Sequence, residues 1–156
     1  MAAKQEEYET SLRAKRTQLG LEGHLHFLGH RADAAALVAD FDIATVCTLP
    51  PGEGFGLVIV EAMARSVPVI STNEGAATEI ITDGQTGVLI PAADAVALAD
   101  AIEELLDDEQ RRRTIGDAGR TVCHRNFDLK KTVLEVQDVY DKILAHRPSV
   151  RPRLTR

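Results

Sequence analysis

Four short runs of aliphatic and β-branched residues recur along this chain, separated by stretches whose apolar residues have helical spacing. Strands that are apolar throughout are typical of parallel sheets covered on both faces. Strands that alternate with helices form parallel βαβ units. The sequence therefore predicts an α/β fold with a doubly wound parallel sheet of about four strands flanked by helices. The predicted strands cover residues 25–29, 42–47, 67–72 and 86–90.

The composition agrees with one domain of this kind. Aromatic residues make up only 4% of the 156 residues and Trp is absent, so the core must consist of Val, Ile, Leu and Ala. The length is typical of a single domain. We expect that domain to span residues 1–146. Residues 147–156 contain four Arg, two Pro and no acid, which predicts a disordered basic tail, with membrane or partner contact as the alternative.

The net charge and the apolar content exclude several classes of function. With 24 acidic against 18 basic residues, the formal charge is −6, which gives no general attraction to nucleic acid or to an anionic membrane. No apolar run reaches the roughly 20 residues that span a bilayer, and the first residues lack the apolar core of a secretion signal. Cys47 and Cys123 have no spacing typical of a disulfide or a metal site. We expect a cytoplasmic protein with reduced thiols.

Capping residues mark the predicted helices. Gly20 ends a helix over residues 6–19, and Asp94 and Asp128 are favourable N-caps for two amphipathic helices. The apolar face after Asp94 comprises Ala95, Leu98, Ile102 and Leu105, and the face after Asp128 comprises Leu129, Val133, Val136, Tyr140 and Ile143. Further helices are predicted near residues 32–39, 57–66, 78–81 and 109–124.

The residues that carry chemistry lie in the loop 48–56 and the helix predicted to follow it. Two carboxylates, Glu53 on the loop and Glu61 about one turn into the helix, are eight positions apart, so both can face a ligand at the start of the helix. In open α/β sheets, ligands bind at the carboxyl ends of the strands, where this loop lies. The pattern indicates a binding site at this edge.

The start of that helix is suited to a phosphate. The amides of Gly56, Leu57 and Val58 lack partners within the helix, and the helix dipole adds positive potential. Gly54 and Gly56 let the backbone approach an anion without a side chain in the way. A carboxylate such as Glu61 could accept from both hydroxyls of a ribose, as acids do in dinucleotide folds. The sequence therefore predicts a site for a nucleotide.

The run EGFGLVIVEAMARSVPVIST resembles the E-x7-E signature of the GT-B retaining glycosyltransferases, the glycosyl transferases of group 1. The resemblance continues through NEGAATEIITDGQTGVLIPAADAVALADAI and RRRTIGDAGR and covers nearly all of residues 25–144. It implies that Glu53 contacts the donor hexose and supports the transition state, and that Glu61 holds the ribose. It also implies that the amides from Gly54 to Leu57 bind the diphosphate, with no metal. The fold implied is a Rossmann-like half of a GT-B enzyme.

The chain departs from the family pattern in three ways. Ser66 stands where a glycine commonly precedes the proline, and Gly75 is followed by Ala76 rather than by a second glycine. The family's donor domain also begins with a further strand, a loop with an Arg and a Lys for the diphosphate, and another strand, none of which precedes Met1. The amino-terminal acceptor domain is missing as well. We therefore expect a donor-binding domain truncated at its amino end, whose first strand has an unpaired edge.

Simpler interpretations exist for each of these residues. Glu53 and Glu61 could be solvated acids, but a lone charge within LVIVEAMA needs a partner, which favours the ribose role for Glu61. Phe55 fits a core position as well as a ligand wall. Glu79 could accept from the donor or cap a helix. Three histidines at positions 24, 26 and 30 lack a carboxylate that would complete a metal site.

Three functions follow in order. The first is transfer of a hexose from a nucleoside-diphosphate sugar to an acceptor with retention. This reaction needs an amino-terminal acceptor domain or a partner chain. Peripheral membrane contact is possible for the complete enzyme. The alternative is a non-catalytic nucleotide-sugar-binding fragment or a split subunit. Nucleotide-sugar epimerases share the fold and rank last, because this E-x7-E spacing is not expected in them.

Overall fold

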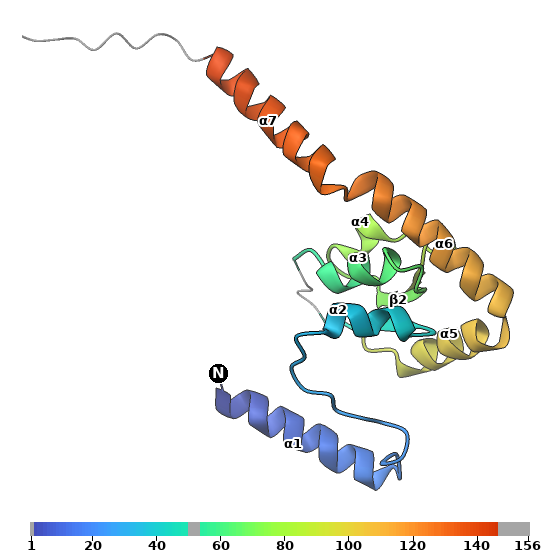
Figure 1. The fold of residues 1–156 in the computed structure, drawn as a ribbon. Helices are drawn as coiled ribbons and strands as arrows, with labels where there is room; N and C mark the ends of the chain where they lie inside the picture. The colour runs from blue at the N-terminus through green and yellow to red at the C-terminus, as the bar shows by residue number, and fades with distance from the viewer. Residues whose placement is uncertain (1, 50–53, 147–156) are drawn as a thin grey trace, which may run out of the picture. The chain divides into compact units, whose positions relative to one another are not determined.

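The computed structural model describes residues 2–49 and 54–146 (Figure 1). The chain separates into two compact units, Met1–Ala34 and Ala35–Arg156. In its described residues, the first unit is a helix followed by irregular chain, and the second holds the sheet and the remaining helices.

Helix α1 (Ala2–Gln18) confirms the first predicted helix. The chain turns at Gly20, whose φ of 66° lies in the left-handed region that a glycine adopts without strain. The apolar residues that predicted this helix, Tyr8, Leu12 and Leu19, are exposed. Their spacing therefore indicated the helix without indicating a buried face.

The strand predicted over residues 25–29 is wrong, because these residues have no regular structure. Strand formation needs a neighbouring backbone edge, and no described segment of the first unit supplies one. Phe27 packs instead beneath two guanidinium groups of α1, with Arg13 and Arg16 at 4.7 and 5.5 Å from the ring centre.

The second unit is built around a parallel sheet of three strands, β1 (Ala44–Val46), β2 (Val69–Thr72) and β3 (Val88–Ile90). The strand order is β1-β2-β3, and Ile70 is paired with Thr45 on one side and with Val88 on the other. All residues of β2 are buried, as expected for a central strand covered on both faces.

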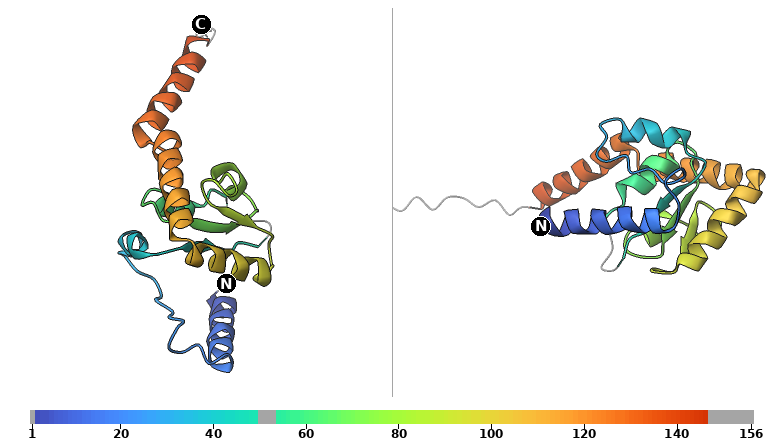
Figure 2. Two further views of the ribbon diagram at one scale, coloured as in Figure 1. Left: turned by 90° about the vertical axis from the view of Figure 1, so that its right-hand side faces the viewer. Right: turned by 90° about the horizontal axis from the view of Figure 1, so that it is seen from below.

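Helices cover both faces of this sheet, which confirms the doubly wound α/β fold with three strands in place of four. One core cluster contains Val69 with Ile59 and Met63 of α3, and the other contains Ile70 with Ala101 and Leu105 of α5. The helices of this unit are α2 (Ala34–Leu37), the 3-10 turn η1 (Val38–Asp40), α3 (Leu57–Met63), α4 (Ala77–Ile80), α5 (Ala95–Asp107), α6 (Glu109–Asn126) and α7 (Leu129–Ala145). Figure 2 shows two further views of this arrangement.

Helix α6 runs antiparallel to α3 and approaches it closely. A Cβ on Gly116 would lie 2.1 Å from the carbonyl oxygen of Ser66, and one on Gly119 would lie 3.5 Å from Cγ of Met63. Further along, the Cys123 thiol lies 3.5 Å from the carbonyl oxygen of Val60. The two glycines of GDAGR therefore allow the two helices to pack closely. Along this contact, α6 runs beside α3 towards the carboxyl edge of the sheet.

Ser66 adopts a φ of 59°, a conformation that costs a residue with a side chain free energy. Its hydroxyl is buried and has no hydrogen-bond partner among the described residues. The family resemblance implies a glycine at this position, and a glycine would adopt this positive φ without strain.

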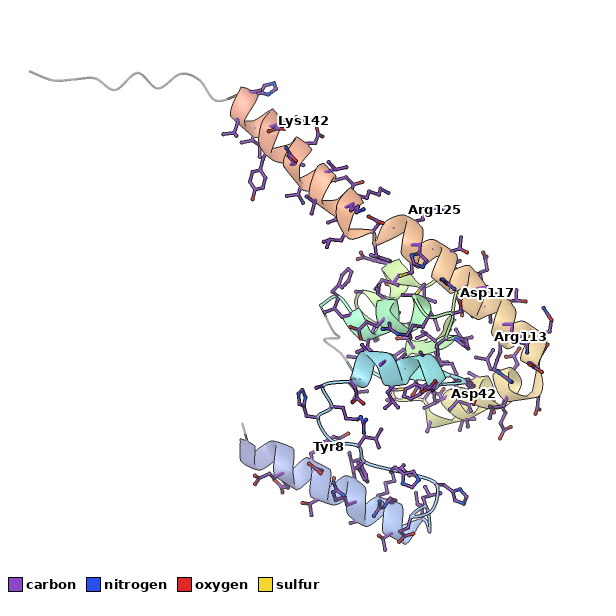
Figure 3. All side chains as sticks on the ribbon, in the orientation of Figure 1. Tyr8, Asp42, Arg113, Asp117, Arg125 and Lys142 are labelled. Carbon is purple, nitrogen blue, oxygen red and sulfur yellow. The ribbon has the colours of Figure 1, made fainter. Side chains whose placement is uncertain are left out.

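Helix α7 confirms the last predicted helix, and the carboxylate of Asp128 accepts from the amides of Lys130 and Lys131 at its start. Its predicted apolar face is present but none of its residues is buried. Figure 3 shows α7, with the labelled Lys142, extending beyond the other elements of this unit, with side chains around the whole helix.

Candidate functional site

The candidate site lies at the carboxyl edge of the sheet. Because all three strands are parallel, the chain leaves β1, β2 and β3 at the same edge. The loop that follows β1 leads to α3, and the loop that follows β2 leads to α4. Ligands of open α/β sheets bind at this edge.

The loop after β1 ends in a glycine whose backbone has the left-handed conformation. Gly56 is the N-cap of α3 with a φ of 73°, and no side chain of the described residues caps the helix. A Cβ on Gly56 would lie 3.1 Å from Cδ1 of Ile59, so a larger residue would be both strained and crowded. Gly54 is exposed, and no atom of the residues that the structure describes lies within 4 Å of where its Cβ would be. Glu53, the predicted catalytic residue, lies outside the described residues.

Glu61 lies on the second turn of α3 and is half-buried. Among residues 2–49 and 54–146, no Lys, Arg or His side chain pairs with its carboxylate. The nearby Arg65 donates instead to the backbone carbonyl oxygen of Glu61, at 2.8 Å. The carboxylate is therefore available to accept from hydroxyl groups.

A cavity of about 350 Å³ separates the end of the β1–α3 loop from α4. Phe55 and Glu79 face it from these two elements, so both predicted residues line one hollow. Glu79 is exposed, and none of the described side chains, its own included, caps α4, so this residue does not make the capping bond that was its alternative role. The lining residues are Gly54, Phe55, Gly75, Ala76, Glu79, Ile80 and Phe127.

Phe127 is a residue of this cavity that the sequence did not single out. Its ring meets that of Phe55 edge to face, with the ring centres 5.7 Å apart and the planes at 80°. It lies between α6 and α7, so the path of α6 along α3 brings it to the site. An apolar residue directly before the Asp128 cap was the only local signal for it.

Two hydroxyl groups of β2 hold the chain that leaves β1. Ser71 donates to the carbonyl oxygen of Val46 at 3.1 Å. Thr72 donates to the carbonyl oxygen of Thr48 at 2.8 Å and accepts from the amide of the same residue at 3.1 Å. These contacts join residues far apart in the sequence, so local patterns could not predict them.

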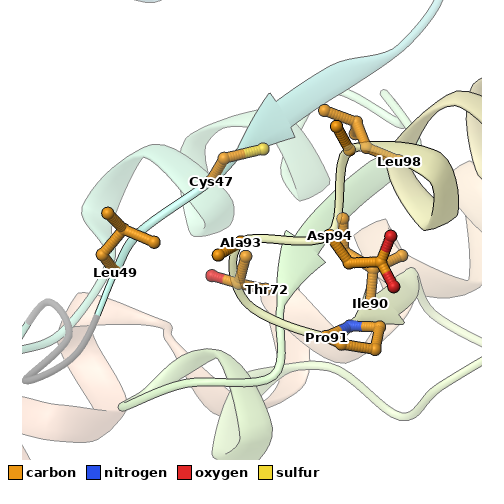
Figure 4. A pocket seen from close by; sticks show the side chains of 9 residues that line it. Cys47, Leu49, Thr72, Ile90, Pro91, Ala93, Asp94 and Leu98 are labelled. Atoms are coloured by element: carbon orange, nitrogen blue, oxygen red, sulfur yellow. The ribbon is translucent and has the colours of Figure 1, made fainter.

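A second cavity of about 280 Å³ opens at the same edge on the α5 side (Figure 4). Cys47, Thr72 and Ile90, each at or just beyond the end of a strand, face one another across it, and Leu98 closes it from α5. Partial desolvation raises the pKa of the Cys47 thiol, although this residue is exposed, and burial raises the pKa of the Cys123 thiol. Both thiols are therefore expected to be protonated and weakly nucleophilic at neutral pH.

Within the described ranges, no three His, Cys, Asp or Glu side chains gather in a way that could hold a metal ion. In the same part of the chain, no helix is long and apolar enough to cross a bilayer.

Comparison with known sequences supports the resemblance noted from the motif. Residues 4–122 match the family described as Glycosyl transferases group 1. N-acetyl-alpha-D-glucosaminyl L-malate synthase of Bacillus anthracis is 36% identical over 126 residues, which cover 81% of this chain and 32% of that protein. Phosphatidyl-myo-inositol mannosyltransferase of Mycobacterium leprae is also 36% identical over 126 residues, covering 80% and 33%. The chain thus spans about a third of the length of these relatives.

Solved structures give the same result. The crystal structure of Anabaena HepE in complex with UDP is similar with a TM-score of 0.85 and 31% identity, covering 88% of this chain and 37% of that one. HepE in complex with UDP-glucose is similar with a TM-score of 0.82 and 32% identity, over 88% and 37%. The family match covers most of the residues, and the fold agrees with a Rossmann-like half of a GT-B enzyme. This chain belongs to the glycosyl transferases group 1 family.

Proposed function

We propose that residues 1–146 form the donor-binding domain of a retaining glycosyltransferase of the E-x7-E type, which transfers a hexose from a nucleoside-diphosphate sugar to an acceptor. The carboxyl edge of the sheet holds the donor. The matched region covers about a third of the relatives' length, so transfer to an acceptor is proposed for the complete enzyme, with the acceptor domain supplied by the remaining part or by a partner chain. We place this enzyme in the cytoplasm.

Each predicted site residue has a role in this proposal. The amides from Gly54 to Leu57 bind the diphosphate, and the uncapped, glycine-led start of α3 suits this role. The unpaired carboxylate of Glu61 accepts from the ribose hydroxyls. Phe55 and Glu79 contribute to the wall of the donor site through the cavity that they share. Donor binding needs no metal ion.

Glu53 is proposed as the catalytic carboxylate. The transition state of glycosyl transfer resembles an oxocarbenium ion, so a carboxylate near the hexose lowers the barrier electrostatically. Backbone amides that donate hydrogen bonds to the diphosphate stabilise the charge of this leaving group in the same step. Retention is tested on the complete enzyme by nuclear magnetic resonance of the first product formed. An inverted anomeric centre would contradict this part of the proposal.

The observation that carries the proposal is the similarity to HepE, whose solved structures are in complex with UDP and with UDP-glucose. The two similarities have TM-scores of 0.85 and 0.82, and each covers 88% of this chain. Most of this fold is therefore similar to a protein whose solved structures are in complex with UDP and with UDP-glucose.

Calorimetric titration of the purified chain with UDP, GDP, ADP and their hexose conjugates tests donor binding. We expect one nucleotide to bind, and Glu61→Ala to weaken its binding by about tenfold or more, because hydrogen bonds to a charged group are lost. Glu103→Ala is the matched control, since Glu103 is an exposed acid on α5 and should leave binding unchanged. A folded chain that binds none of these compounds, or equal binding by Glu61→Ala, would contradict the proposal.

A further inference from the structure

Phe127 lines the cavity beside α4 from a position that the core determines. It is the C-cap of α6, and its amide donates to the carbonyl oxygen of Cys123 at 2.9 Å. Cys123 is only 5% exposed and belongs to the core cluster on the α3 face of the sheet, against which Phe127 itself packs. Phe127 is half-buried, so part of its ring remains open to the cavity.

Glu79 lines the same cavity and is supported by the same cluster. It lies on α4 between Ala77 and Ile80, both of which are buried in that cluster. Its amide donates to the carbonyl oxygen of Ala76 at 3.0 Å, whereas its side chain is exposed. Among residues 2–49 and 54–146, its carboxylate makes no ion pair. The core thus holds an aromatic ring and a hydrogen-bond acceptor beside one cavity.

The size and charge of this cavity indicate which part of a donor it suits. Its volume of about 350 Å³ is near the lower end of the roughly 300–1,000 Å³ typical of ligand pockets, which favours one ring over a whole donor. The described residues that line it include no Lys, Arg or His, and a carboxylate would repel a diphosphate. The cavity therefore suits a neutral group.

A hexose matches the two kinds of surface that this cavity offers. Its hydroxyl groups donate hydrogen bonds that a carboxylate accepts, and such bonds are stronger than those between neutral groups. Its C–H groups form an apolar face that packs on an aromatic ring. A nucleobase would also bring acceptor atoms, which the Glu79 carboxylate cannot satisfy.

We propose that Phe127 is a specificity-determining residue for the donor sugar: its ring takes the apolar face of the hexose while Glu79 accepts from the hydroxyl groups. This inference rests on the proposed function, because the hexose is that of the nucleoside-diphosphate sugar. It assigns to the junction of α6 and α7 a contact with the sugar and none with the nucleotide.

Three variants of the full chain test the contact made by the ring. Phe127→Leu keeps an apolar side chain but removes the flat ring, whereas Phe127→Tyr keeps the ring. Phe41→Leu is the matched control: Phe41 is 41% exposed, but it precedes β1 and lies at the opposite edge of the sheet. Calorimetry measures the affinity of each variant for UDP, GDP and ADP and for their glucose conjugates.

The affinity for a glucose conjugate divided by the affinity for its nucleotide alone separates sugar contact from structural support. A disturbed fold lowers both affinities, whereas a lost sugar contact lowers only the first. We expect Phe127→Leu to weaken binding of the conjugate by about fivefold and to leave that of the nucleotide unchanged. Phe127→Tyr and Phe41→Leu should keep the wild-type ratio. An unchanged ratio in Phe127→Leu would overturn the proposal.

Glu79→Ala tests the second contact at an exposed position, where the substitution leaves the core intact. We expect it to weaken binding of the conjugate by about tenfold or more and to spare the nucleotide, because hydrogen bonds to a charged group are lost. Glu103→Ala is again the control. Glu61→Ala should weaken both compounds alike, because the proposed partner of Glu61 is the ribose. Equal weakening of both compounds in Glu79→Ala would overturn its assignment to the sugar.

The wild-type chain distinguishes failure of this inference from failure of the proposed function. If it binds neither a nucleotide nor a conjugate, the proposed function fails and this inference fails with it. If it binds both and the ratio stays the same in Phe127→Leu and Glu79→Ala, the donor site stands and the sugar contacts are refuted. Binding of the nucleotide with exclusion of its glucose conjugate would likewise refute them.

Discussion

Helices α5 and α7 begin alike but lie in different surroundings. Each follows an Asp whose carboxylate accepts from two backbone amides, and each has one apolar face. In α5 that face packs on the sheet, where Leu105 is completely buried. In α7 every side chain is exposed.

The difference comes from what precedes each helix. A short connection joins β3 to α5, so the helix must fold back along the sheet. Helix α7 begins only after α6 has passed along α3 to the carboxyl edge, where none of the described strands extends beneath it. An amphipathic pattern therefore indicates that a helix has an apolar face, while the chain connection determines whether the face is covered.

The largest expected effect is on the core. Leu105→Ala should lower the free energy of unfolding by about 3 kcal/mol, because it removes a buried side chain and leaves a cavity. Leu134→Ala, the same substitution at a 66% exposed position of α7, should change it by less than about 0.5 kcal/mol. Urea unfolding followed by circular dichroism measures both values.

An equal loss in Leu134→Ala would break the comparison between the two helices. It would mean that the apolar face of α7 is covered in solution. Sedimentation at several protein concentrations would then show whether a second copy of the chain covers it, because that arrangement makes the measured stability depend on concentration.

Helix α6 differs from α7 in its packing, because it contacts α3 closely although it leads directly to α7. Gly116→Ala should lower the free energy of unfolding by about 2 kcal/mol or more, because the new Cβ would lie 2.1 Å from the Ser66 carbonyl oxygen and the helix must move. Gly23→Ala is the control, since none of the described residues has an atom within 4 Å of the position of its Cβ. Similar stability of the two variants, measured by urea unfolding, would show that α6 does not approach Ser66 so closely.

The sequence predicted the features that depend on neighbouring residues. Asp94 and Asp128 marked the starts of α5 and α7, because a cap acts on amides two or three residues away. The strand over residues 25–29 failed, because pairing depends on a distant edge. The site was predicted as a run of consecutive residues around Gly54 to Glu61. Thr72 was missed because its contact with Thr48 depends on how distant segments meet.

The smallest expected effect concerns the two capping residues. Asp94→Ala should lower the free energy of unfolding by about 1 kcal/mol, because α5 unfolds together with the sheet and loses the bonds to the amides of Val96 and Ala97. Asp128→Ala removes the same kind of bonds from α7, but this helix makes few contacts with the core, so global unfolding should be unchanged. Urea unfolding measures the first effect, and amide hydrogen exchange at the first turn of each helix measures the local loss.

Asn at each position is the control, because its side-chain oxygen can still cap the helix. Asp94→Asn and Asp128→Asn should therefore resemble the wild type in both measurements. A drop in global stability for Asp128→Ala as large as that for Asp94→Ala would show that α7 unfolds with the core. In that case the apolar face of α7 has a partner in solution, and the two helices differ in what covers them rather than in whether they are covered.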